Sequence, residues 1–66
     1  MDDSSAVSTE VEKRIRALEA NIAAQTRIVA ELERDGRKVG GAKTILRVLE
    51  QQRQALRRLI HNLESN

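Results

Sequence analysis

The chain has 66 residues, with 12 basic and 10 acidic side chains for a net charge of +2, and it contains one histidine, no cysteine and no Phe, Tyr or Trp. This composition excludes a disulfide framework and a cysteine-based metal site, and one histidine leaves a structural zinc site short of ligands. A single domain of this size buries little surface, so we expect it to need a second chain for stability.

Neither a membrane span nor a secretion signal is expected. The longest run without a charged residue is Ala20–Thr26, far shorter than the ~20 apolar residues that a spanning helix needs. After Met1, residues 2–5 are acidic or polar, unlike a signal peptide. We therefore expect a cytoplasmic protein with no membrane partner, no cofactor and no metal.

Residues 1–8 are small and polar and are predicted to form a disordered lead-in, followed by a helical hairpin over residues 9–64. Thr9 and Glu12 have capping-box spacing, which predicts a first helix from about residue 9 to about 35. After Val11 the apolar residues recur alternately four and three apart, a coiled-coil heptad. Its predicted interface positions are Ile15, Leu18, Ile22, Gln25, Val29 and Leu32.

Residues 36–41 are predicted to form the turn. Gly36 follows Asp35, and a glycine at this place can take the left-handed conformation that ends a helix. Gly40 and Gly41 would each cost a continuous helix about 1 kcal/mol, so a turn is preferred.

The second helix is predicted over about residues 42–63. Its apolar stripe is wide, which indicates contact with more than one neighbouring helix. Two hairpins that join into a four-helix bundle would satisfy both contacts. The predicted fold is therefore all-α: an antiparallel, coiled-coil-like two-helix hairpin that dimerises into a four-helix bundle. The predicted interface residues of the second helix are Ile45, Leu46, Leu49, Gln52, Leu56, Leu59, Ile60 and Leu63, with Val48 beside them.

A turn centred on residues 38 and 39 would place Gln25 level with Gln52, and Leu18 near Leu59. Two amides in one layer could bond each other and penalise slipped registers. Two unrelated, solvent-exposed glutamines are the alternative.

Two stretches resemble catalytic or binding motifs without meeting their requirements. Residues 36–44 approach the phosphate-binding pattern G-x-x-x-x-G-K-[ST], but Ala42 separates Gly41 from Lys43 and no strand precedes the loop. The carboxylates of Glu31, Glu33 and Asp35 have arginines at helical spacing and are expected to form ion pairs. No catalytic residue is predicted, and we do not expect an enzyme.

Charge differs between the two halves. Residues 1–33 contain four basic and seven acidic side chains, a net of −3, whereas residues 34–61 contain eight basic and two acidic ones, a net of +6. An acidic helix beside a basic one favours pairing within a hairpin or a dimer.

The predicted function is thus a self-associating protein–protein interaction module, a homodimer acting as adaptor, regulator or scaffold. The alternative is nucleic-acid binding by a basic face of the second helix. This basic face comprises Lys43, Arg47, Arg57 and Arg58.

The stretch from Ile22 to Arg37, followed by Ala42–Leu46 and Leu49–Glu50, resembles short helical-hairpin proteins of rhizobia and related proteobacteria. Their shared pattern is Q-x-x-[IV]-[IV]-x-x-L-E-x-D-G, a short turn and a leucine-rich second helix. The resemblance covers roughly residues 22–58 and implies a hairpin fold in the bacterial cytoplasm, but no activity. Those proteins usually have Asp and Thr residues that would cap the second helix, where this chain has residues 38–41, Lys-Val-Gly-Gly.

Overall fold

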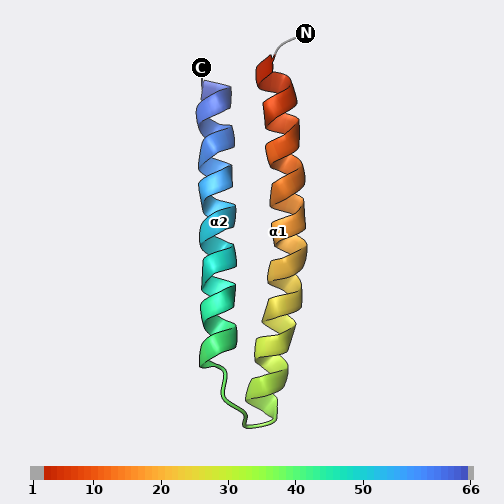
Figure 1. Cartoon of the computed structure of the whole chain (residues 1–66), viewed down its shortest axis with the longest axis vertical. Coiled ribbons are helices and arrows are strands. Elements are labelled where there is room, and N and C mark those ends of the chain that lie inside the picture. The colour runs from red at the N-terminus through yellow and green to blue at the C-terminus, as the bar shows by residue number, and fades with distance from the viewer. Residues whose placement is uncertain (1–2, 66) are drawn as a thin grey trace.

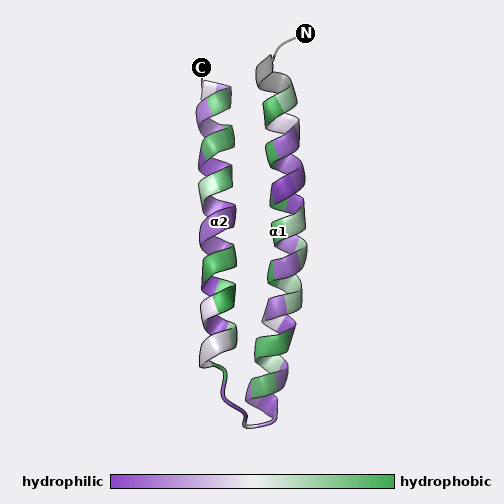
Figure 2. Cartoon of the chain, in the orientation of Figure 1, coloured by the Kyte–Doolittle hydropathy of each residue, from purple (hydrophilic) through white to green (hydrophobic). Residues whose placement is uncertain are grey.

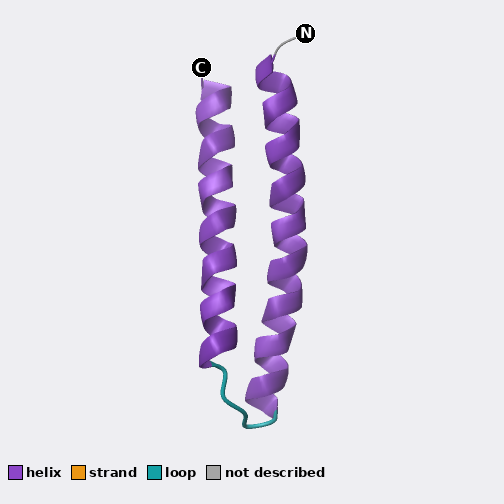
Figure 3. Cartoon of the chain, viewed as in Figure 1, coloured by secondary structure: helices purple, strands orange, loops and turns teal. Residues whose placement is uncertain are grey.

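The computed structural model of the chain describes residues 3–65 and shows two helices joined by a short turn. Helix α1 spans Asp3–Arg34 and helix α2 spans Gly40–Ser65. The helices lie side by side and antiparallel, so both termini are at one end and the turn is at the other (Figure 1). Over the described residues there is no strand (Figure 3) and no helix apolar enough to cross a membrane. The predicted all-α hairpin is confirmed.

Helix α1 begins earlier than predicted. Of the predicted disordered lead-in, residues 1 and 2 lie outside the described range, whereas residues 3–8 form the first turns of the helix. Thr9 lies inside the helix, so its predicted role as N-cap is wrong. Ser8 is half-buried three residues before the buried Val11. The apolar pattern missed this first interface position because the side chain there is polar.

The end of α1 has the geometry that its glycine predicts. Gly36 has a φ of 69°, in the left-handed region. The amide of Arg37 donates to the carbonyl of Leu32 at 2.9 Å, and that of Gly36 donates to the carbonyl of Glu33 at 3.1 Å. These two bonds form a Schellman motif, which satisfies carbonyls that the helix end leaves open.

Helix α2 begins at Gly40, slightly before the predicted residue 42, and without a capping side chain. The carbonyl of Val39 accepts the amide of Lys43 at 2.9 Å, which makes Val39 the N-cap residue. Valine offers no side-chain oxygen to the free amides of the first turn, and no acidic residue lies in that turn.

Contact between the helices follows one heptad on each side, and hydrophobic residues recur along both helices (Figure 2). Among residues 6–65, only Val11, Ile15 and Val29 are buried, with 7–8% of their surface exposed. Every other residue of this contact is half-buried, and all remaining residues from 6 to 65 are exposed. The interface positions, three and four residues apart, are Ser8, Val11, Ile15, Leu18, Ile22, Gln25, Val29 and Leu32 on α1, and Val39, Ala42, Leu46, Leu49, Arg53, Leu56, Ile60 and Leu63 on the α2 side.

The register differs from the predicted one. The side-chain amide of Gln25 donates to the backbone carbonyl of Ala42 at 3.1 Å, while Gln52 is exposed. Leu18 lies across from Gln52 and Leu56, since these side chains line one groove, so Leu18 is not level with Leu59. Of the two alternatives for the glutamines, the paired layer is not formed: Gln25 is half-buried in the interhelical contact and Gln52 is exposed.

Candidate interaction surface

The hairpin has two faces, on opposite sides of the interhelical contact. Successive residues of a helix point about 100° apart. A residue directly before an interface position therefore lies on one face, and a residue directly after it lies on the other. The two faces of this hairpin differ sharply in chemistry.

One face, here called the apolar face, contains every large hydrophobic side chain that the described residues expose. These five side chains have 43–53% of their surface exposed. Each directly precedes an interface position: Ser8, Val29, Leu46, Leu49 or Ile60. The five residues are Val7, Ile28, Ile45, Val48 and Leu59.

A groove of about 470 Å³ runs along the middle of this face. The five exposed side chains continue the groove along the helices, because each is seven residues from one of its lining residues. On α1, Val7 lies seven residues before Arg14, and Ile28 lies seven residues after Asn21. On α2, Ile45 and Leu59 lie seven residues before and after Gln52, and Val48 lies seven residues before Ala55. The lining residues are Arg14, Ala17, Leu18, Asn21, Gln52, Ala55 and Leu56.

The opposite side, here called the ion-pair face, contains two salt bridges between the helices. Arg57 Nη2 lies 3.4 Å from Glu19 Oε2, and Lys43 Nζ lies 3.4 Å from Glu33 Oε2. All four residues directly follow interface positions. Because their side chains are 44–56% exposed, each pair is expected to contribute less than about 1 kcal/mol. The acidic first helix and basic second helix thus meet within one chain.

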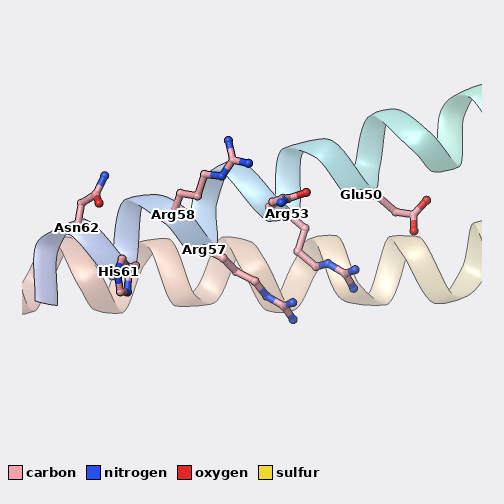
Figure 4. A pocket seen from close by; sticks show the side chains of 7 residues that line it. Glu50, Arg53, Arg57, Arg58, His61 and Asn62 are labelled. Atoms are coloured by element: carbon pink, nitrogen blue, oxygen red, sulfur yellow. The ribbon is translucent and has the colours of Figure 1, made fainter. Parts of the chain in front are cut away.

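The predicted basic face is only partly free. Lys43 and Arg57 are engaged in these salt bridges, whereas Arg47 and Arg58 are exposed. A second concavity, of about 570 Å³, lies on α2 alone (Figure 4). Its lining is mostly cationic or amide, with one carboxylate. The lining residues are Glu50, Arg53, Gln54, Arg57, Arg58, His61 and Asn62.

The predicted interface residues separate into two groups. Most lie in the contact between α1 and α2: Ile15, Leu18, Ile22, Gln25, Val29, Leu32, Leu46, Leu49, Leu56, Ile60 and Leu63. Three others, Ile45, Gln52 and Leu59, are exposed on the apolar face instead. Sequence reasoning did not assign Val7, Ile28 or Arg53 to either surface. The signal for Val7 and Ile28 is their position directly before a heptad residue of α1.

Among residues 3–65, no three side chains of the metal-binding types come close enough together to hold an ion. No family model, curated protein or solved structure matches the chain. Its interaction surfaces are therefore the basis for proposing a function.

Proposed function

We propose that this chain is a self-associating protein–protein interaction module in which a second copy covers the apolar face and completes a four-helix bundle. The observation that supports this proposal is the collection of Val7, Ile28, Ile45, Val48 and Leu59 on one face. Scattered exposed hydrophobic residues are ordinary on a soluble protein, but a contiguous apolar surface rimmed by polar residues is typical of an interface.

The size of this face suits a dimer. The hairpin measures 53 Å by 15 Å along its two longer principal axes, so its flat outline on this side covers about 800 Å². A standard stable interface buries about 800 Å² on each partner. A second copy is favoured as the occupant because the α2 half of the face, from Ile45 to Leu59, holds no charged residue. Two copies of it can therefore meet without like-charge repulsion.

The interior of the single chain supports the same proposal. None of the residues of α2 is buried, and from residue 6 to its end α1 buries only Val11, Ile15 and Val29. Helical hairpins depend on packed apolar faces for most of their stability, since short isolated helices are marginal in water. A second copy would enclose Leu18 and Leu56, which line the groove between the helices.

The test compares two variants, each with one new carboxylate, on opposite faces of α2. We expect Leu59→Glu to convert the dimer to a monomer at micromolar concentration, because a charge would be buried in the interface. Gln54→Glu is the matched control: Gln54 directly follows Arg53 and lies on the side of the ion-pair face. The mass is measured by light scattering after size-exclusion chromatography. A Leu59→Glu variant that keeps the mass of the wild-type dimer would contradict the proposal.

In this assembly the ion-pair face and the outer side of α2 stay accessible. They would be the surfaces that an adaptor, regulator or scaffold presents to a further protein. The cationic concavity on α2 is the most distinctive of them, with Arg53, Arg57, Arg58 and His61 along one helix.

This concavity also supports a second candidate function, nucleic-acid binding. Phosphate contacts by several arginines would make the affinity fall steeply with salt. We expect Arg58→Ala to weaken binding to a short DNA duplex and to reduce that salt dependence, with Lys13→Ala on α1 as the control. Absence of binding at low salt would remove this candidate. It ranks second because Lys43 and Arg57 already pair with carboxylates of α1.

A further inference from the structure

We infer that Asn21 and Gln52, which form a polar layer in the middle of the apolar face, set the register in which two copies join. This inference rests on the proposed self-association. It assigns a specific role to two residues that are otherwise exceptions on an apolar surface.

The two residues lie across from each other in the groove, one on each helix. Both are exposed, and within the described residues neither side-chain amide has a hydrogen-bond partner. Gln25 differs from them, because its amide lies in the contact between α1 and α2 and donates to the carbonyl of Ala42. The free donors and acceptors of Asn21 and Gln52 are thus available to a second chain.

The nearest neighbours of this layer on the face are apolar, and Arg14 lies beyond Ala17 on α1. Alanines flank Asn21 at Ala17 and Ala24, and Val48 and Ala55 flank Gln52 at the spacing that keeps them on the same face. Large hydrophobic residues follow toward each end of the hairpin. Ile28 and Ile45 lie toward the turn, whereas Val7 and Leu59 lie toward the termini.

The position of the layer along the hairpin makes it self-complementary. Gln52 lies 12 residues after Gly40 and 13 before Ser65, at the middle of α2, and Asn21 is near the middle of α1. A two-fold axis that crosses the middle of the bundle brings this layer against its own copy. A two-fold axis along the bundle does the same.

A slipped register would separate these groups. Shifting one copy by a heptad would place the amides of one chain against Ile45, Val48 or Leu59 of the other. Buried amides without partners are costly, so the slipped forms would be disfavoured. Single polar residues at the interface positions of coiled coils fix register and oligomeric state in this way, at some cost in stability.

The test replaces both amides with leucine, in the variant Asn21→Leu/Gln52→Leu. We expect unfolding at a higher urea concentration than the wild type, because apolar surface replaces the polar layer. We also expect several registers to be populated. A nitroxide label at Lys13→Cys, an exposed position, should give one distance between the two labels in the otherwise wild-type dimer and several distances in the double-leucine variant, because the registers are no longer distinguished. The matched control is Thr26→Leu/Gln54→Leu, which places one leucine on each helix directly after an interface position, and it should keep the single label-to-label distance.

A double-leucine variant that remains dimeric and keeps the single label-to-label distance of the wild type, whatever its stability, overturns the inference and leaves the proposed dimer standing. A wild-type chain that sediments as a monomer overturns the proposed function and this inference together. Far-ultraviolet circular dichroism of each variant verifies that the helices are intact.

Discussion

At the scale of single residues, the glycines near the turn have different roles. Gly36 holds a positive φ that L-residues with a Cβ rarely adopt, and its amide is bonded within the Schellman motif. Gly40 lies at the start of α2, where an added Cβ would meet no atom within 4 Å. Glycine is needed at the first position, whereas at the second it only adds conformational freedom to the unfolded chain.

We therefore predict opposite effects for two equivalent substitutions. Gly36→Ala should lower the free energy of unfolding by about 1 kcal/mol, because alanine is strained at that φ. Gly40→Ala should raise it by about 0.5–1 kcal/mol, because alanine favours the helix. Urea unfolding followed by circular dichroism, at one protein concentration, measures both. Equal effects of the two substitutions would contradict this account of the turn.

Arg53 is the one charged residue at the interface positions of α2, where it is half-buried. Its aliphatic stem can pack in the contact while the guanidinium extends to solvent. We predict that Arg53→Leu raises the free energy of unfolding by about 1 kcal/mol, because leucine buries more apolar surface. Arg58→Leu, at an exposed position, is the control and should change it little. No gain from Arg53→Leu would show that Arg53 lies outside the interhelical contact.

At the scale of the elements, α1 was predictable and the packing of α2 was not. On α1, a single apolar heptad identifies the interface from Ile15 to Leu32. On α2, two heptad patterns fit the sequence. Both contain Leu49, Leu56 and Leu63, and at the other positions the second pattern takes the next residue along the chain. They therefore differ in whether Gln52 or Arg53 occupies the central interface position. Gln52 is the residue predicted there, whereas the structure has Arg53 at that position, half-buried, with a side chain long enough to reach water.

The apolar stripe on α2 is wide because it combines two heptads. The heptad that contains Gln52 lies outside the hairpin contact, on the apolar face. Ile45 and Leu59, which were predicted among the interface residues of the second helix, are exposed. The start of α1 was missed for a different reason. Its first interface residue is Ser8, which an apolar pattern does not detect.

The salt bridges between the helices are expected to guide pairing more than to stabilise it. We predict that Arg57→Ala lowers the free energy of unfolding by less than about 1 kcal/mol, because the pair with Glu19 is largely solvent-exposed. The effect should shrink further at high salt, because ions screen exposed charges. Urea unfolding at low and high salt tests this. A large loss that persists at high salt would contradict the surface character of the pair.

At the scale of the whole molecule, folding and self-association are expected to be linked. The single chain buries few residues, and Leu56 takes part both in the helix contact and in the groove of the apolar face. We predict that Leu56→Asp dissociates the dimer and melts both helices, since a carboxylate there meets apolar surface on two sides. Circular dichroism and the solution mass are measured on the same sample. Full helicity at micromolar concentration would contradict this linkage.

The most direct test of the proposed assembly is the solution mass of the unmodified chain, measured by sedimentation equilibrium over a range of concentrations. Covering the apolar face with a second copy predicts a mass of twice 7.4 kDa that falls, together with the helicity, only on strong dilution. A mass of 7.4 kDa at every concentration, with the helices intact, would show that the hairpin is stable alone and that no second copy covers this face.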